Sequence, residues 1–478
     1  MLWCRFPQRL LFFRTSIAIQ RNHFVMDSKL LINADKEGLE FAAAAISQGQ
    51  LVAFPTETVY GLGANALDAH AVLSIFEAKG RPLTDPLIVH IADVTSALEL
   101  VSIDANTEEV FRVLAAEFWP GPLTVIMKAA PCIPRVVTAN SGFVGLRIPS
   151  HPLALEFLQT CRLPIAAPSA NRFGHVSPTR AQHVIDDLGE KGVRVLDGDS
   201  NDQFSGHTCL HGIESTVLKI DAAANRILIL RQGAVSQREV ELQLAQCSAV
   251  SNWAVESVHR AVPMPHSTLC DNSTDGGIST DPAPTASPDQ PAPAVEEVGE
   301  VAPGQLVTHY APYIPCFVLT SSAYHPVSAS DSFVYPSSPQ QECNVSAAAE
   351  QYSQLSKTLS RNDLATGAVV IDFGGQLNWF VDKCLAYREL SLSGSTVDAA
   401  KDIFSVLRWA EVQEGATIVL IAPIIGMEVP VPVEGTALGR EFTPIYLESR
   451  NRIFDPSLGL ADRIFRSASG VSLDLKIV

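Results

Sequence analysis

Apolar and polar positions in the first half of the chain predict short buried strands that alternate with helices. Residues 36–49 have the period of an amphipathic helix ending at Gly49, and the apolar run QLVAFP follows directly. A second helical pattern, AHAVLSIFEAKG, ends at Gly80. Further β-rich runs are bounded by glycine, proline or charge, namely PLIVHI, LTVIMK, STVLKI and RILILR. We therefore expect a mixed α/β or α+β domain in residues 30–237.

A second ordered pattern begins near residue 303. AVVIDF and TIVLIAP have the composition of buried strands, and TVDAAKDIFSVLRWAEVQ between them has that of an amphipathic helix. Apolar strands joined by a helix are typical of a parallel, Rossmann-like unit. A further helical pattern, LADRIFRSASG, ends at Gly470. These features predict a Rossmann-like second domain in residues 303–478, and an α/β fold class for the chain.

Two segments lack such a pattern. Residues 238–302 are dominated by proline, serine, threonine, glycine and acids, and no lysine or arginine occurs between Arg260 and Lys357. Because such a segment buries too little apolar surface to offset its ordering entropy, we expect a flexible acidic linker. Residues 1–29 carry arginines but no acid before Asp27. This pattern is typical of a mitochondrial presequence, and the alternatives are a disordered extension or initiation at Met26.

Composition limits the classes of protein that fit. The 478 residues are 47% hydrophobic and 18% charged, which is typical of a globular chain of several domains. The most apolar stretch, from Ala416, is interrupted by Pro423, Glu428 and Pro430, so we expect no membrane association. The nine cysteines include no C-x-x-C pair, which favours reduced thiols and a cytoplasmic protein. A net charge of -17 argues against a surface that coats nucleic acid, but leaves room for a local basic site.

Several signatures of nucleotide and metal chemistry are absent from the sequence, including a P-loop, H-E-x-x-H and G-x-S-x-G. HTCLH, residues 207–211, fits no zinc spacing and reads as a polar loop. Cations and hydroxyls instead recur in loops at strand ends, a set that suits a ligand with several phosphates. Taken singly, each also has a structural explanation, such as a helix C-terminal lysine, an ion pair or a core histidine. The set comprises Thr56, Thr58, Lys79, Arg81, Arg147, Ser169, Asn171, Ser177, Ser215, Thr216 and Arg231.

The order of these segments resembles the YrdC-like threonylcarbamoyl-adenylate synthases in their two-domain form. The resembling stretches are FPTETVYGLGANA, KGRPLTDPLIVHI, FWPGPLTVIM, GLRIPSHP, APSANRFGHVSPT, GIESTV and ILRQG. APGQLVTHYAP, residues 302–312, resembles the linker motif that folds over the active site in that form. The resemblance implies a twisted open sheet with a basic concave cleft in the first domain, and a Rossmann-like second domain.

The resemblance also implies the reaction and its partners. It implies a nucleotidyltransferase that makes threonylcarbamoyl-AMP and pyrophosphate from L-threonine, bicarbonate and ATP, with Mg²⁺ accompanying ATP and no metal site in the protein. The product would pass to a tRNA threonylcarbamoyl transferase for tRNA modification, and double-stranded RNA binding would be weak. Lys79 and Arg81 would act on the triphosphate. The implied threonine contacts are Thr58, His90, Arg147, Ala167 and Ser215, and the implied ATP contacts are Arg81, Asp85, Phe143, Ser169, Ser177, Arg231 and Tyr310.

The sequence departs from the resembled pattern at a few positions. Asp85 stands where many members carry asparagine, Gln232 stands where proline is usual, and no basic residue directly precedes HYAP. Residues 430–452 add unusual length. Two alternatives remain open: a nucleic-acid-binding module whose Lys79 and Arg81 contact phosphodiesters, and a carbamoyltransferase domain like those of hydrogenase maturation. The latter proteins add zinc-finger parts, and this chain has no paired C-x-x-C.

Overall fold

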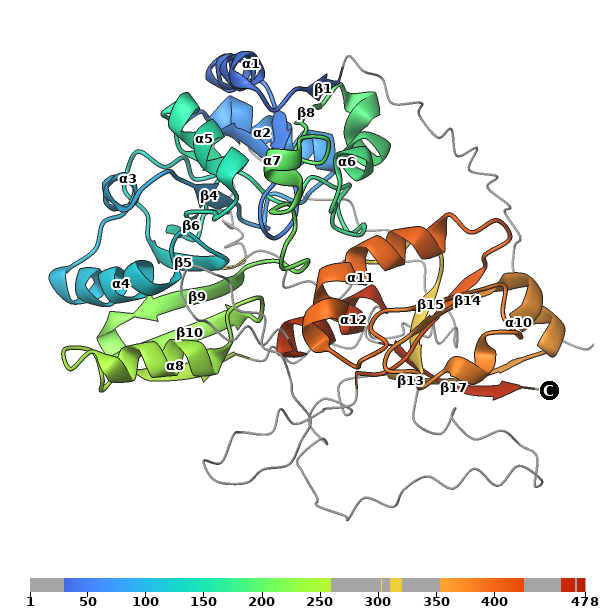
Figure 1. The fold of residues 1–478 in the computed structure, drawn as a ribbon. Coiled ribbons are helices and arrows are strands. Elements are labelled where there is room, and N and C mark those ends of the chain that lie inside the picture. The colour runs from blue at the N-terminus through green and yellow to red at the C-terminus, as the bar shows by residue number, and fades with distance from the viewer. Residues whose placement is uncertain are drawn as a thin grey trace, which may run out of the picture.

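The computed structural model describes residues 30–258, 302, 310–319, 353–424, 457–468 and 471–477. These residues form two units, one around an 11-stranded sheet and one around a six-stranded sheet (Figure 1). The N-terminal extension, most of the expected acidic linker and the added length at residues 430–452 lie outside the described residues. Within the described part, no helix is long and apolar enough to cross a membrane.

The first sheet mixes parallel and antiparallel pairs. Its order is β1-β8-β2-β3-β7-β4-β6-β5-β9-β10-β11. The expected runs PLIVHI, LTVIMK, STVLKI and RILILR contain β4, β5, β9 and β10, which confirms their prediction as strands. The bounds are β1 Leu31–Ile32, β2 Val52–Phe54, β3 Gly61–Asn65, β4 Ile88–His90, β5 Leu123–Lys128, β6 Phe143–Arg147, β7 Ile165–Ala166, β8 Arg194–Leu196, β9 Thr216–Asp221, β10 Arg226–Arg231 and β11 Ala254–Ser257.

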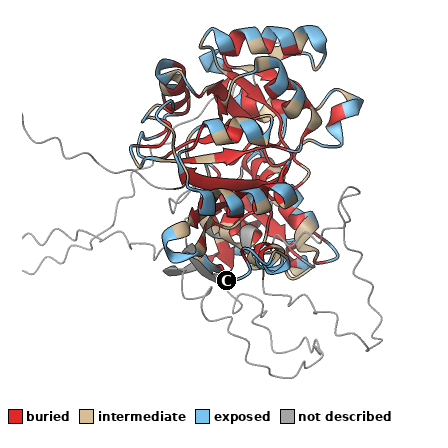
Figure 2. Ribbon diagram, turned by 90° about the vertical axis from the view of Figure 1, so that its left-hand side faces the viewer, coloured by how far each residue is buried: buried red, intermediate tan, exposed pale blue. Residues whose placement is uncertain are grey.

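Helices cover this sheet and turn their exposed faces outward (Figure 2). Both helices predicted from the start of the sequence are present. The second of them, α2, begins after Asp68, whose side chain accepts hydrogen bonds from the backbone N–H groups of His70 and Ala71. It ends at Gly80, whose φ of 67° lies in the left-handed region that favours glycine. The helices are α1 Lys36–Ser47, α2 Ala69–Lys79, α3 Val94–Glu99, α4 Ala105–Phe118, α5 Pro152–Cys161, α6 Ala181–Leu188, α7 Asp202–Ser205 and α8 Gln237–Gln246.

The first domain extends beyond the expected boundary at residue 237. Helix α8 follows it directly, and β11 then pairs in parallel with β10. The predicted start of the acidic linker at residue 238 is therefore wrong. Ser236 and Glu239 form a capping box at the start of α8, and Val240 and Leu244 pack into the core. The polar composition of this stretch masked a helix that buries only one narrow face.

The second domain confirms the expected Rossmann-like unit. Its sheet has the order β13-β17-β12-β16-β14-β15, and every pair in it is parallel. AVVIDF contains β14 and TIVLIAP contains β16, with α11 before β16. The bounds are β12 Cys316–Leu319, β13 Ser353–Leu359, α10 Arg361–Gly367, β14 Ala368–Asp372, β15 Ala386–Glu389, α11 Thr396–Glu411, β16 Ile418–Ile421, α12 Ser457–Ser467 and β17 Val471–Ile477.

The two domains share apolar contacts. Val59, Val176 and Ile213 of the first domain belong to the same buried cluster as Tyr310 and Phe404. Burial of this kind removes apolar surface of both domains from water and stabilises their docking. The second domain is therefore packed against the loops that follow the strands of the first sheet.

Candidate functional site

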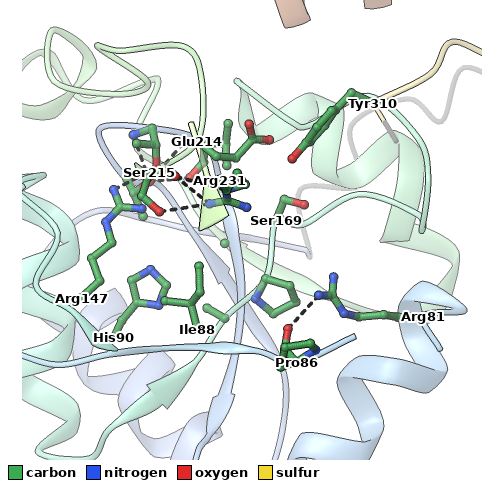
Figure 3. Close-up of a pocket in the computed structure, with 16 residues that line it drawn as sticks. Arg81, Pro86, Ile88, His90, Arg147, Ser169, Glu214, Ser215, Arg231 and Tyr310 are labelled. Carbon is green, nitrogen blue, oxygen red and sulfur yellow. Dashed lines mark hydrogen bonds between the residues drawn. The ribbon is translucent and has the colours of Figure 1, made fainter. Parts of the chain in front are cut away.

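One pocket collects most of the site residues expected from the sequence (Figure 3). Its walls come from loops at the ends of β2, β4, β6, β7 and β10, and from the segment that carries Tyr310. Distant parts of the chain therefore converge on one place, as the loop pattern predicted. The expected residues that line it are Thr58, Arg81, His90, Arg147, Ala167, Ser169, Ser215, Arg231 and Tyr310.

Arg147 stands at the end of β6 with its guanidinium held in one orientation. Its Nη2 atom donates to Glu57 Oε1 at 2.6 Å and to Thr58 Oγ1 at 2.9 Å. Its Nε atom donates to the carbonyl of Gly121 at 3.3 Å. Burial raises the pKa of the Glu57 carboxyl, but the charge and hydrogen bond of Arg147 outweigh this and hold the pKa below its usual value. A fixed guanidinium results, whose Nε–H and both Nη2–H groups are already used, so that it can bind a carboxylate through its Nη1–H groups.

His90 lies next to Arg147 because β4 and β6 are parallel and these two residues are in register. Its ring is buried and meets Phe54 edge to face at a centroid distance of 5.9 Å. Burial, and then the Arg147 charge, lower the pKa of His90 to about 3. The imidazole is therefore neutral near pH 7, and its Nδ1 atom has no hydrogen-bond partner among the described residues. A neutral imidazole can exchange a hydrogen bond with a small polar ligand.

Ser215 and Arg231 form a second fixed pair across the pocket. Arg231 Nη2 donates to Ser215 Oγ at 3.1 Å and to the Ser215 carbonyl at 3.0 Å. Ser215 Oγ also lies 2.8 Å from Thr124 Oγ1. Gly233 permits this close approach, since a Cβ atom there would lie 2.4 Å from the backbone of Ser215 and Thr216. Close packing against the backbone of Ser215 and Thr216 therefore explains why the ILRQG motif carries a glycine at position 233.

Lys79 and Arg81 separate in the structure. Arg81 lines the pocket, and its Nη2 atom pairs with Asp85 Oδ2 at 3.0 Å and donates to the Pro86 carbonyl at 2.9 Å. Lys79 does not line the pocket: its buried ammonium donates to the carbonyls of Ser169 and Asn171. Burial, and then the charge of Arg81, lower the pKa of Lys79. The structure thus places Lys79 behind the Ser169 loop, where it does not face a phosphate as the sequence led us to expect.

Three other expected ligands also lie outside the pocket lining. Asp85 neutralises Arg81, so its carboxylate already has a cationic partner. Ser177 Oγ donates to Glu214 Oε1 at 2.7 Å and supports that carboxylate from behind. The ring of Phe143, at the start of β6, lies under Lys219 Nζ at 3.7 Å from the ring centroid. Their roles in the structure are to hold charged neighbours.

Tyr310 closes the pocket on the side of the second domain (Figure 3). It is 1% exposed, and its ring lies 5.3 Å from that of Phe404 in α11. The neighbouring Ala311 N–H donates to the Gly174 carbonyl at 2.9 Å, which ties the segment to the first domain. His309 of the same HYAP motif lies outside the described residues. The tyrosine of the linker motif is thus held between the two domains.

Sequence reasoning missed two carboxylates, Glu57 and Glu214. Glu57 lies between the two threonines of the TET turn, and Glu214 directly precedes Ser215 and lines the pocket. Both stand beside hydroxyls that drew attention as ligands. A signal was present, because an acid inside a Gly- and Thr-rich loop is expected to need a buried cation. The partners are Arg147 and Arg463, far away in the sequence.

The HTCLH loop supports the threonine turn. The N–H of Cys209 donates to the Thr56 carbonyl, and the N–H of His211 donates to the Glu57 carbonyl, both at 2.9 Å. Over the described residues, three or more His, Cys, Asp or Glu side chains gather nowhere in a way that could hold a metal ion. In the structure, the HTCLH loop therefore holds the backbone of Thr56 and Glu57 beside Arg147.

Two family models match the chain. The model described as "Telomere recombination" matches residues 44–233, and the model described as "Threonylcarbamoyl-AMP synthase, C-terminal domain" matches residues 269–437. The first range contains the pocket residues of the first domain. The second covers the start of the second domain and much of its sheet.

Curated relatives match the first domain. A threonylcarbamoyl-AMP synthase of Pyrococcus abyssi is 46% identical over 203 residues, which is 42% of this chain and 56% of the relative. The Bacillus subtilis enzyme of the same name is 46% identical over 202 residues, with 42% and 54% covered. The chain thus matches about half the length of these two relatives. A putative threonylcarbamoyl-AMP synthase of Mycobacterium tuberculosis is 35% identical over 204 residues, with 42% and 87% covered.

Solved structures match both domains together. The crystal structure of Pyrococcus abyssi Sua5 complexed with L-threonine superposes with a TM-score of 0.60 at 26% identity, and covers 94% of this chain and 99% of that one. A doubly substituted variant of the same Pyrococcus abyssi protein superposes with a TM-score of 0.59 at 26% identity, covering 94% and 98%. The likeness therefore extends across the domain boundary.

Proposed function

Because this chain belongs to the Sua5, YciO and YrdC family, we propose that it is an L-threonylcarbamoyladenylate synthase. It would make threonylcarbamoyl-AMP and pyrophosphate from L-threonine, bicarbonate and ATP. The observation that carries the proposal is the pocket itself. A fixed Arg147 guanidinium and a neutral His90 stand at one part of it, and Arg81 and Arg231 stand at others.

The amino acid fits the part of the pocket around Arg147. Its carboxylate would accept hydrogen bonds from the guanidinium, which Glu57 and Thr58 hold in place. The neutral imidazole of His90 would face the substrate's hydroxyl or amine without adding a charge. The solved Pyrococcus abyssi relative is a complex with L-threonine, which supports this substrate.

The nucleotide would bind as its magnesium complex along the remaining cations. Arg81 and Arg231 can donate to phosphate oxygens from their Nη1 atoms, since their Nε and Nη2 atoms already bond within the protein, and Ser169 offers a hydroxyl. Glu214 is the carboxylate in the lining, and both of its oxygens already accept hydrogen bonds from Ser177 and Arg463. Magnesium would therefore be held chiefly by phosphate oxygens and water, as is usual for this ion.

The reaction would proceed in two steps without a covalent enzyme intermediate. The threonine amine attacks the carbon of bicarbonate or CO₂, and an N-carboxylate forms as water or a proton leaves. A carboxylate oxygen then attacks the α-phosphorus of ATP, and the bond to the β-phosphate oxygen breaks to release pyrophosphate. Negative charge develops on the phosphoryl oxygens and the leaving group, where preorganised cations such as Arg81 and Arg231 stabilise it. Tyr310 over the pocket would exclude water from the labile intermediates.

The product would serve tRNA modification in the cytoplasm. A mixed anhydride of a carbamate and AMP is hydrolytically labile, so direct transfer to a tRNA threonylcarbamoyl transferase is favoured over diffusion. Nine cysteines without a C-x-x-C pair support a reducing compartment. Weak binding of double-stranded RNA by the cationic face of the first domain is part of the same proposal.

The test is a reaction with purified full-length chain, ATP, L-threonine and bicarbonate, followed by mass detection of threonylcarbamoyl-AMP and pyrophosphate. Omission of threonine or bicarbonate should abolish pyrophosphate release. Glu57→Gln, which keeps the shape but weakens the hold on Arg147, should raise the threonine KM by about tenfold. Glu108→Gln, which breaks the exposed pair with Arg112, is the matched control and should leave the threonine KM unchanged. ATP hydrolysis indifferent to threonine, or RNA binding without turnover, would contradict the proposal.

A further inference from the structure

We propose that Arg463 of the second domain is a positioning residue for the pocket, which holds Glu214 and Tyr310 in place across the domain boundary. The inference rests on the proposed function and gives the second domain a role in that function. Helix α12, which carries Arg463, would have to be docked for the pocket to bind nucleotide productively.

Arg463 is the largest fully buried side chain of the described part, with 0% exposure. Its Nε atom donates to Glu214 Oε2 at 2.7 Å, and its Nη1 atom pairs with Asp462 Oδ2 at 2.6 Å. Its guanidinium carbon lies 5.2 Å from the centroid of the Tyr310 ring. Two of these partners, Glu214 and Tyr310, line the pocket. A side chain from the second domain thus reaches two walls of a pocket built mainly by the first.

The contact with Glu214 has an electrostatic consequence. Glu214 places a buried carboxylate in a pocket that would have to receive a polyphosphate. Ser177 neutralises none of its charge, because it donates only a neutral hydrogen bond to Oε1. Arg463 supplies the full positive charge at Oε2. Without it, the carboxylate would lose its ion-pair partner in a buried site, and the nearby charge of Arg231 would offset less of its repulsion of an anionic substrate.

The contact with Tyr310 has a geometric consequence. The ring contacts Phe404 of α11 and Arg463 of α12, so two helices of the second domain help to fix it. A guanidinium beside an aromatic ring is attracted to its electron-rich face. Removal of the guanidinium would weaken the hold of the second domain on the ring, and residues 310–315, which precede β12, would open more often. Arg463 thus both positions the Tyr310 ring and compensates the charge of Glu214.

A merely structural arginine would act differently from a positioning one. Loss of a buried structural ion pair lowers stability but leaves the kinetic constants of the folded fraction unchanged. Loss of a positioning contact changes the KM for ATP in molecules that remain folded. The negative charge of Glu214 provides a second discriminator, since Glu214→Gln removes the charge that Arg463 compensates.

The experiment compares Arg463→Gln, Arg463→Lys and the double variant Arg463→Gln with Glu214→Gln in full-length protein. Arg463→Gln should raise the ATP KM by about tenfold or more, with a smaller change in the threonine KM. The double variant should recover part of that loss, because it leaves no carboxylate without its ion-pair partner. Arg463→Lys should be intermediate. Arg112→Gln, at an exposed arginine paired with Glu108 at 2.6 Å, is the control and should change the ATP KM less than threefold.

Amide hydrogen exchange of residues 310–315 provides a readout that does not depend on turnover. Exchange should speed up in Arg463→Gln and stay at the wild-type rate in Arg112→Gln, with folding verified by thermal melting of each variant. An unchanged ATP KM together with unchanged exchange in an active enzyme would overturn the inference and leave the proposed function intact. Faster exchange in a chain whose wild type makes no threonylcarbamoyl-AMP would overturn the proposed function and retain the positioning contact. If Arg463→Gln does not fold, Arg463→Lys is compared with the double variant Arg463→Lys with Glu214→Gln. An ATP KM in the double variant that is no lower than that of Arg463→Lys would show that the electrostatic coupling is absent.

Discussion

Lys79 and Arg81 are two residues apart, yet their side chains have different tasks. Helix α2 ends between them at Gly80, whose left-handed backbone turns the chain. As a result, Lys79 points under the loop of Ser169 and Asn171, and Arg81 points into the pocket beside Asp85. The two cations therefore contribute separately, one by fixing a loop and one by facing the ligand.

The first prediction at this scale concerns Lys79. Lys79→Met should lower the free energy of unfolding by about 1–3 kcal/mol, because two buried carbonyls lose their donor. It should also lower kcat/KM by about tenfold, since the Ser169 loop shifts relative to the pocket. Urea denaturation and steady-state kinetics measure the two effects. Lys36→Met, at a largely exposed lysine paired with Glu40 at 3.9 Å, should change neither by a comparable amount. Wild-type kcat/KM in Lys79→Met would show that the loop does not depend on the ammonium.

The sequence identified the cations and hydroxyls of the site better than the carboxylates. Arg147 and Arg231 were expected because they stand at strand ends, where loops converge, and His90 was expected from the family resemblance. Glu57 and Glu214 were missed because the ion pairs that explain them join residues far apart in the chain. Local spacing carries no information on such pairs. For the same reason, the buried orientation of Lys79 could not be read from KGRP.

At the scale of elements, short strands between glycine and proline were predictable, and the domain edge was not. The interior runs are apolar on both faces and therefore stand out in the sequence. The edge elements α8 and β11 are largely polar, because they bury only one side against β10 and the core. An edge helix next to a long acidic segment resembles that segment in composition. The capping box at Ser236 and Glu239 was the local signal that separates the two.

The prediction at this scale tests whether α8 is part of the first domain's core. Leu244→Ala should lower the free energy of unfolding by about 2–5 kcal/mol, because Leu244 is 2% exposed within the main hydrophobic cluster. Leu242→Ala on the same helix is the matched control. Leu242 is 53% exposed, so its replacement should change stability by less than about 0.5 kcal/mol. Urea unfolding followed by circular dichroism compares them. Equal effects of the two substitutions would mean that α8 does not pack as described.

The whole molecule depends on how its two domains meet, and a buried polar cluster lies at that boundary beside the apolar contacts. His175 Nδ1 lies 2.8 Å from Asp187 Oδ2, and His175 Nε2 lies 3.0 Å from Glu411 Oε2 of the second domain. Arg408 of the second domain pairs with Asp187 at 2.9 Å, and the Tyr313 ring stacks on His175 at a centroid distance of 4.1 Å. Each ring nitrogen of His175 thus faces a carboxylate, one from each domain.

This cluster couples domain docking to protonation of His175. Burial lowers its pKa, but hydrogen bonds to Asp187 and Glu411 outweigh burial, so the folded pKa is raised above 6.5. A group with a raised folded pKa stabilises the fold fully below its unfolded pKa, and that contribution is lost as pH rises through the folded pKa. The buried His183 acts in the opposite sense. Its folded pKa is lowered to about 3, so it costs stability only as pH falls below 6.5. From pH 6.5 to about 8, where free thiols of the unfolded chain begin to ionise, a loss of stability therefore reports on His175, because buried Lys79, whose folded pKa is lowered, adds stability as pH rises.

We therefore expect wild-type stability to fall as pH rises from 6.5 to about 8, with the loss located at the domain boundary. His175→Gln keeps a polar side chain that can bond to one carboxylate but cannot carry the charge, so its melting temperature should be lower at pH 6.5 and nearly independent of pH over the same interval. His70→Gln, at an exposed histidine on α2, is the control and should retain the wild-type slope. Thermal melting at several pH values, with hydrogen exchange of α11 to locate the change, measures this. A slope that persists in His175→Gln would assign the pH dependence to another group, and a flat wild-type profile would mean that folded His175 is already neutral at pH 6.5 and that its pKa is not raised.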